Sequence, residues 1–123
     1  MFEPFTVLAR AKINLALHVL GRRLDGYHDL DSIVAFADMG DVLRFSPADC
    51  FSLSADGPFA ADLPPPEHNI ITRAWAKTKD LAGGLPPVAV HLTKNLPVAS
   101  GIGGGSANAA AALRGFLRIA AGI

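Results

Sequence analysis

Cysteine is almost missing from this chain, and neither sign of charge is in excess. Cys50 is the single cysteine among 123 residues, which excludes an internal disulfide and a metal site built from several thiolates. Lys and Arg together number 11, as do Asp and Glu, so the formal net charge is zero. This balance removes the simplest electrostatic argument for nucleic-acid binding, although a small anion needs only local positive potential.

Long apolar runs are lacking as well. No run approaches the roughly 20 residues that a membrane-spanning helix needs, and the first residues, Met1-Phe-Glu-Pro, lack the basic and apolar segments of a signal peptide. Half of the residues are hydrophobic and 18% are charged, which favours a packed core over disorder. We therefore expect a soluble, cytoplasmic protein, and its length is enough for one domain but not for two ordinary ones.

The first segment with a strand pattern runs from residue 5 to residue 20. Its sequence, FTVLARAKINLALHVL, alternates between two faces, and a period of two is typical of a β-strand. Lys12 and Asn14 fall on the same face. Asp25-Gly26 then marks a turn to a second apolar run at 30–36. The connection is longer than a two-residue turn, so its tip can do more than reverse the chain.

Short strands and two helices are predicted in the rest of the chain. Residues 41–45 and 51–54 have the pattern of strands in a meander, and 87–93 that of a further strand. Asn69 is a suitable N-cap for a helix that ends at Gly83-Gly84, and a second helix covers about 105–120. The apolar face of the first helix comprises Ile70, Ile71, Ala74, Trp75, Thr78, Leu81 and Ala82. Because strands cluster before helices, the order predicts an α+β fold.

A glycine-rich loop precedes the second helix, where residues 96–110 read LPVASGIGGGSANAA. Glycine lets backbone N–H groups turn toward a ligand, and the first N–H groups of a helix attract anions together with the helix dipole. A loop of this kind predicts a phosphate site. Ser106 could then cap the helix, contact a phosphate or bind a phosphate-bound Mg²⁺. A flexible connection before an ordinary helix is the alternative.

The loop matches none of the common glycine patterns. A P-loop needs a lysine after the glycines, and the dinucleotide pattern G-x-G-x-x-G would require glycine where Ser106 stands. A protein-kinase glycine loop joins two strands, whereas this one leads into an alanine-rich helix. The spacing Pro97-x-x-x-Gly101-Ile-Gly-Gly-Gly-Ser-Ala instead resembles the phosphate loop of the GHMP kinases, a family of small-molecule kinases.

The start of the chain narrows this resemblance. Ala11-Lys-Ile-Asn-Leu, followed by Asp25-Gly-Tyr-His, is similar to the members that phosphorylate a cytidine diphosphate-linked methylerythritol in the non-mevalonate route to isoprenoids. The resemblance implies that ATP and Mg²⁺ are used to phosphorylate the 2-hydroxyl of that substrate. It also implies a mostly antiparallel sheet with helices on one face, a domain that also occurs in ribosomal proteins and elongation factors.

The resemblance assigns roles to individual residues. Lys12 would be catalytic, stabilising the attacking alkoxide and the charge on the transferring phosphoryl group. The substrate would be bound by Asn14, Tyr27 and His28. The ATP-binding residues would be Pro97, Val98, Ala99, Ser100, Gly101, Ile102, Gly103, Gly104, Gly105, Ser106, Ala107, Asn69 and Lys94. Ser106 is also the candidate ligand for Mg²⁺.

Ordinary structural roles remain open for these residues. Lysines are mostly exposed, so Lys12 and Lys94 can be solvated side chains, and Asn69 can be an N-cap alone. Asn14 can be a satisfied strand amide, and Tyr27 with His28 the exposed tip of a turn. Trp75 is expected in the core. Surface or structural positions are expected for His18 and His91, and turn or surface positions for Asp29, Asp31, Asp38 and Asp41.

The resemblance covers the whole chain, yet these kinases are more than twice as long. They continue to a GADVP-like segment with the proposed catalytic aspartate, and then to a second domain. We therefore expect residues 1–123 to be an incomplete N-terminal domain that transfers phosphate poorly by itself. A non-catalytic nucleotide-binding module, or an inert piece of another GHMP kinase, is the alternative. Without the rest of the protein to cover them, the last helix and part of the sheet should expose apolar surface, through which a homodimer could form.

Overall fold

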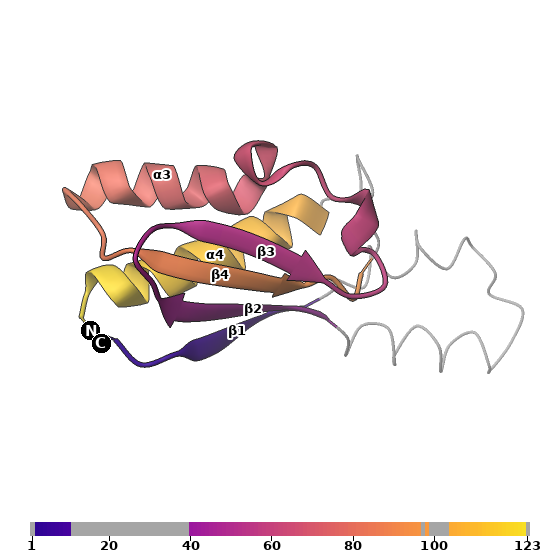
Figure 1. Ribbon diagram of the computed structural model, residues 1–123, viewed down its shortest axis with the longest axis horizontal. Coiled ribbons are helices and arrows are strands. Elements are labelled where there is room, and N and C mark those ends of the chain that lie inside the picture. The colour runs from indigo at the N-terminus through magenta and orange to yellow at the C-terminus, as the bar shows by residue number, and fades with distance from the viewer. Residues whose placement is uncertain (1, 11–39, 97, 99–103, 123) are drawn as a thin grey trace, which may run out of the picture.

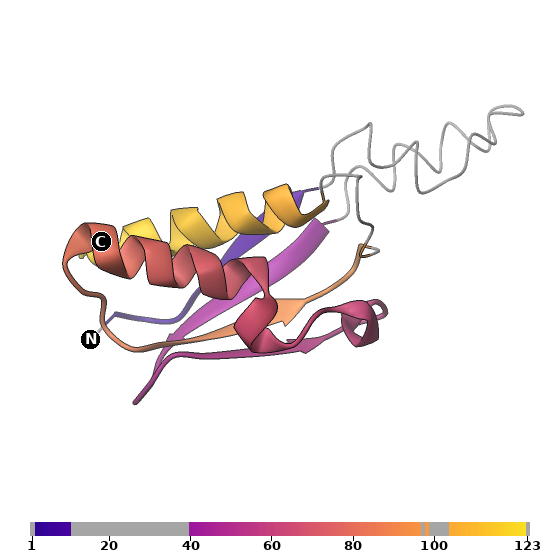
Figure 2. The same cartoon turned by 90° about the horizontal axis from the view of Figure 1, so that it is seen from above.

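The computed structural model describes residues 2–10, 40–96, 98 and 104–122. In these residues a four-stranded sheet carries helices α3 (Ile70–Ala82) and α4 (Gly104–Ala120) side by side on one face (Figure 1, Figure 2). The strands are β1 (Phe5–Arg10), β2 (Gly40–Pro47), β3 (Ser52–Asp56) and β4 (Val88–Thr93), and the short 3-10 turns η1 (Ala60–Asp62) and η2 (Pro66–His68) connect β3 to α3. The predicted α+β class is confirmed.

The strands follow the order β1-β2-β4-β3 across the sheet. β2 pairs antiparallel with both β1 and β4, whereas β3 and β4 are parallel. The predicted meander is therefore wrong, because β4 lies between the two strands that should have been neighbours. Parallel neighbours need a crossover connection, and α3 provides it. β4 takes the central place because Val88, Val90 and Leu92 are all buried, while β3 has only the half-buried Leu53 on its inner face.

The predicted alternation of the first strand is confirmed for Phe5–Arg10, where the half-buried or buried residues Phe5, Val7 and Ala9 share one face. The remainder of that predicted strand, the turn at 25–26 and the apolar run at 30–36 lie outside the described residues. Within the part of the chain that is described, no helix is both long enough and apolar enough to cross a membrane.

Helix α3 begins and ends as its sequence predicts. The side-chain oxygen of Asn69 accepts a hydrogen bond from the backbone N–H of Ile71 at 2.9 Å, and Gly83 ends the helix in the left-handed conformation with φ 74°. The predicted apolar face is too wide, however. Ile70 and Ala82 are exposed, and Leu81 is 80% exposed, because only one stripe of the helix meets the sheet and α4. The helical residues that are buried are Ile71, Ala74 and Thr78.

Phe45 of β2 is the centre of the core between sheet and helices. Its ring is fully buried, stacks on Phe5 with 5.0 Å between centroids, and meets Phe116 of α4 edge-on at 5.4 Å. Gly115 lets α4 approach the sheet, since a Cβ there would lie within 2.6 Å of ring atoms of Phe45. Trp75 is half-buried and stacks on Phe51 at 4.1 Å, at the margin of this core. The contact between Gly115 and Phe45 thus helps to set how closely α4 lies on the sheet.

Candidate functional site

Most residues that the sequence assigns to a site lie outside the described residues. These are Lys12, Asn14, Tyr27, His28, Pro97, Ala99, Ser100, Gly101, Ile102 and Gly103. The backbone of residues 104–106 forms the first turn of α4, Ala107 packs against the core, and Val98 is 39% exposed. Asn69 and Lys94 are the two predicted residues whose polar side chains are described, and both are buried. Their roles in binding stay predictions.

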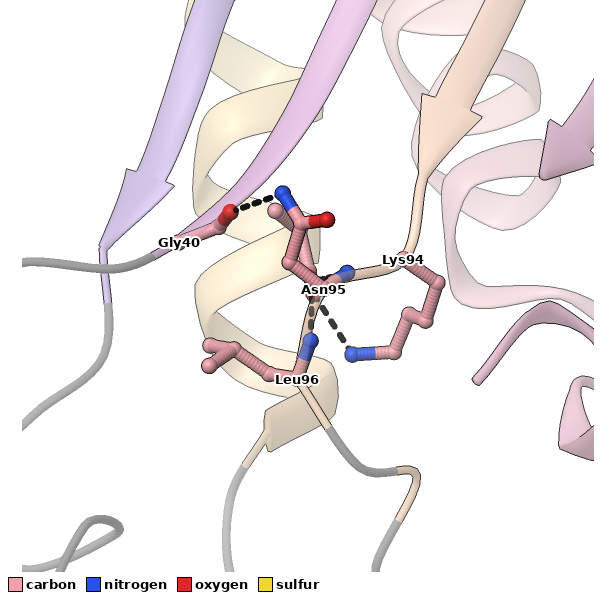
Figure 3. Close-up of polar contacts among 5 residues, drawn as sticks. Gly40, Lys94, Asn95 and Leu96 are labelled. Atoms are coloured by element: carbon pink, nitrogen blue, oxygen red, sulfur yellow. Dashed lines mark hydrogen bonds and ion pairs between the residues drawn. The ribbon is translucent and has the colours of Figure 1, made fainter. Parts of the chain in front are cut away.

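A buried carboxylate lies where the chain leaves β4. Asp41 is 1% exposed, and its Oδ2 accepts a hydrogen bond from Nζ of Lys94 at 2.6 Å. Its Oδ1 accepts the backbone N–H groups of Asn95 at 2.8 Å and of Leu96 at 2.9 Å. The amide of Asn95 in turn donates to the carbonyl oxygen of Gly40 at 2.8 Å, so the donors of residues 94–96 converge on the start of β2 (Figure 3). The carboxylate therefore has three donors, one of them a cation.

This geometry corrects one expectation and excludes one alternative. Asp41 is not a turn or surface acid, and the alternative of a solvated Lys94 is excluded, because its side chain is 3% exposed. Alternation along β2 places Asp41 on the inner face with Leu43 and Phe45. One step beyond the Val42–Thr93 pair, the antiparallel register brings Asp41 opposite Lys94. A buried charge needs a partner, and each of these residues supplies it to the other.

The backbone of Lys94 is also fixed from the β3 side. Its N–H donates to the carbonyl oxygen of Asp56 at 2.8 Å, and its carbonyl oxygen accepts the N–H of Phe59 at 3.2 Å. Gly57, with φ 104°, allows this approach, since a Cβ there would lie 2.8 Å from the carbonyl oxygen of Lys94. The end of β4 is therefore fixed between β2 and β3 immediately before the glycine-rich segment begins.

A pocket of about 260 Å³ lies between β3 and the chain that leads to α3. Its lining residues are Leu53, Ser54, Ala55, Ala60, Leu63, Pro64, Pro65, Pro66 and Asn69. Most of these side chains are apolar, and Asn69 contributes an amide whose oxygen already caps α3. Apolar walls with a few polar groups suit a flat heterocycle.

Asn108 of α4 is a candidate that the sequence pattern did not single out. Its side chain is 4% exposed, and its Oδ1 has no hydrogen-bond partner in the described part of the protein. A buried acceptor without a partner costs about 1–3 kcal/mol, which is a reason to look for a ligand or a water near it. The sequence did contain a signal that could have identified it, because Asn108 is the one polar residue in the alanine-rich run at 107–112.

The outer face of the sheet carries a second polar cluster. Nδ1 of His91 lies 2.7 Å from Oγ of Ser54, and its Nε2 lies 3.0 Å from Oδ1 of Asp56. Hydrogen bonds from His91 and then Thr93 hold the pKa of Asp56 below its usual value. The side chain of Asp56 is 66% exposed, so water screens the pair. We assign the cluster to cross-strand stabilisation, which agrees with the expected surface or structural role of His91.

Comparison with known proteins connects this geometry to a family. Residues 69–122, from the N-cap of α3 to the end of α4, match the N-terminal domain of the GHMP kinases. The chain is 60% identical over 110 residues to the 4-diphosphocytidyl-2-C-methyl-D-erythritol kinase of Roseobacter denitrificans, covering 89% of this chain and 36% of that protein. Proteins of the same name from Paramagnetospirillum magneticum and Rhizobium etli are 53% and 55% identical over 94% and 90% of this chain. The chain spans 36–40% of the length of these relatives.

Proposed function

We propose a function for this chain from the premise that it belongs to the GHMP kinases, the family whose N-terminal domain its residues 69–122 match. Residues 1–123 form an ATP- and substrate-binding N-terminal domain. The enzyme to which that domain corresponds phosphorylates the 2-hydroxyl of 4-diphosphocytidyl-2-C-methyl-D-erythritol, in the non-mevalonate route to isoprenoids. The observation that carries the proposal is 53–60% identity to kinases of that name over about nine-tenths of the chain.

In this proposal two parts of the described structure bind the nucleotide, a pocket and the start of a helix. The pocket beside Asn69 receives the adenine, because its walls are apolar and its single amide can bind a base edge. The first backbone N–H groups of α4, which begins at Gly104, bind phosphate oxygens. Bound ATP supplies the phosphoryl group, and Mg²⁺, for which Ser106 is the proposed ligand, neutralises phosphate charge.

The residues that we propose for phosphoryl transfer and for substrate binding lie outside the described part of the chain. Lys12 stabilises the charge that develops on the attacking oxygen and on the transferring group. Asn14, Tyr27 and His28 bind the cytidine-linked alcohol, with the tyrosine ring stacked on the pyrimidine and the histidine bound to a base edge. Because the chain spans only 36–40% of its relatives, binding is the part of the activity that we propose for it. Self-association through exposed apolar side chains stays a prediction.

Calorimetry on the 123-residue chain tests the proposal. We expect saturable binding of ATP with Mg²⁺ and, at a separate site, of cytidine diphosphate. Asn69→Ser is a sharp variant, because serine caps a helix as well as asparagine does but lacks the amide. It should keep the free energy of unfolding within about 0.5 kcal/mol and weaken ATP binding.

The matched control is Ser52→Ala, an exposed position on β3 that is not among the lining residues of the pocket. Binding of cytidine diphosphate should be unaffected by either substitution. A wild-type chain that is folded by circular dichroism and binds neither ligand at millimolar concentration would contradict the proposal. Binding of ATP without cytidine diphosphate would favour the alternative of a nucleotide-binding module from another GHMP kinase.

A further inference from the structure

The polar cluster on the outer face of the sheet has a fixed direction of hydrogen bonding. The carboxylate of Asp56 only accepts, so Nε2 of His91, 3.0 Å from its Oδ1, carries a proton and donates the hydrogen bond. In a neutral imidazole the other ring nitrogen then keeps a free lone pair. That nitrogen, Nδ1, lies 2.7 Å from Oγ of Ser54, so the serine hydroxyl donates to it. The donors therefore run from Ser54 through His91 to Asp56.

This order of groups activates a hydroxyl as a nucleophile. A serine hydroxyl attacks well only when an adjacent base takes its proton, and the base works best when a third group fixes its tautomer and stabilises its charged form. His91 is placed to be that base, and Asp56 to be the third group. The two ring nitrogens are exchanged relative to the usual serine-hydrolase triad. The roles nevertheless require only one protonated nitrogen and one lone pair, and both are present.

The cluster is built on paired strands and is open to solvent. Ser54 of β3 is the direct partner of His91 of β4 in the parallel register, and Asp56 lies two residues further along β3, on the same face. Groups on strands are held more precisely than groups on loops. The side chains of His91 and Asp56 are 40% and 66% exposed, so a small molecule can reach them. Water also screens their charges, which limits the reaction to acyl compounds with a good leaving group.

We propose that Ser54 is an acylation site, whose Oγ accepts the acyl group of an activated ester. Oγ attacks the carbonyl carbon and forms the new C–O bond, while the hydroxyl proton moves to Nδ1 of His91. The bond to the leaving oxygen then breaks, that oxygen keeps the electron pair, and the imidazolium passes its proton to it. Ser54 and His91 are the catalytic residues of this step, and Asp56 is a positioning residue. The step is independent of the proposed nucleotide site.

The test treats the 123-residue chain with p-nitrophenyl acetate and follows acetylation of each serine by peptide mass spectrometry. All chains carry Cys50→Ala, which removes an exposed thiol that would compete for the ester. Ser52 is the matched control within the same chain, because it is exposed on the same face of β3 but pairs with Ala89 and not with a histidine. General-base assistance typically gives about 10²–10⁴-fold. At this exposed site we expect Ser54 to react about tenfold faster than Ser52, or more.

Two substitutions separate the roles of the cluster. His91→Gln keeps a polar side chain beside Ser54 but removes the base, so the rate at Ser54 should fall to that at Ser52. Asp56→Asn keeps an acceptor for Nε2 but removes the charge that stabilises the imidazolium, so the rate at Ser54 should fall several-fold.

The ratio of the two rates should also fall on acidification, because a protonated His91 has no lone pair to accept the hydroxyl proton. The charged groups that the strand register places beside His91 are Asp56 of β3 and Arg44 of β2. A merely structural role of the cluster would leave this ratio independent of pH.

Equal rates at Ser54 and Ser52 would overturn the inference, as would a preference for Ser54 that survives His91→Gln or persists when His91 is protonated. The comparison of the two serines in the chain that keeps His91 changes nothing in the cluster, so it decides the question even if a variant does not fold.

Discussion

Substitution of Gly115 by alanine tests the closest contact in the core. Gly115 lies in the middle of α4, where alanine is the better helix former by about 1 kcal/mol. The added Cβ would nevertheless lie 2.5 and 2.6 Å from the two Cε atoms of Phe45, and closer still to its Cζ. Such distances require either the ring or the helix to move.

Neither movement is easy in this core. The ring of Phe45 is fully buried between Phe5, at 5.0 Å, and Phe116, at 5.4 Å. Overpacking of a buried site costs about 3 kcal/mol at the upper end of its usual range. After subtracting the gain in helix propensity, we expect Gly115→Ala to lower the free energy of unfolding by about 2 kcal/mol.

Urea unfolding followed by circular dichroism measures this difference. Ala110→Gly at an exposed position of α4 is the matched control, and it should lose about 1 kcal/mol through propensity alone. Phe45→Leu should partly relieve the clash, so a double-mutant cycle with Gly115→Ala should give a favourable coupling of about 1–2 kcal/mol. If Gly115→Ala were as stable as the wild type, α4 would not be held at this distance from β2, and the argument would be refuted.

Two further predictions concern the ends of elements. Asn69→Ala removes the cap of α3 and should cost about 1 kcal/mol in urea, whereas Asn69→Ser should not. The hydrogen bond from His91 lowers the pKa of Asp56 from 3.8, so this carboxylate favours the folded state above pH 3.8, and that contribution is lost as the pH falls through the lower folded-state pKa. In His91→Val the pKa should return toward 3.8 in a carboxyl NMR titration; an unchanged pKa would show that the contact is not formed in solution.

Element boundaries were predictable because their causes are local. The cap at Asn69, the left-handed Gly83 and the alternation in Phe5–Arg10 depend on neighbours a few residues away. The partner of β3 was not predictable in this way. The predicted meander made β2 and β3 neighbours, but the more apolar β4 took the place beside β2. Burial of Val88, Val90 and Leu92 outweighs the proximity of β2 and β3 in the chain.

The site residues were predictable mainly from the resemblance of their motifs to a family, and only in part from the alternation of residues along the strands. The residues of the glycine loop and of the N-terminal motifs stay predictions, whereas Asp41 was assigned wrongly. Its place in the alternating pattern of β2 did carry a signal, since Asp41 shares the inner face of that strand with Leu43 and Phe45. Its partner could not be identified, because Lys94 is 53 residues away in the sequence and pairs with it only through the register of β2 and β4.

That same register connects the core to the candidate site. A slip of one residue between β2 and β4 would turn Phe45 away from α4 and Asp41 away from Lys94 together, since successive side chains alternate between the faces. The apolar core therefore specifies where the charged pair forms, and the pair specifies where the chain leaves β4. Gly115→Ala should accordingly disturb the core end of β2, whereas Asp41→Asn should disturb the hydrogen bonds to residues 94–96 at the other end of the strand.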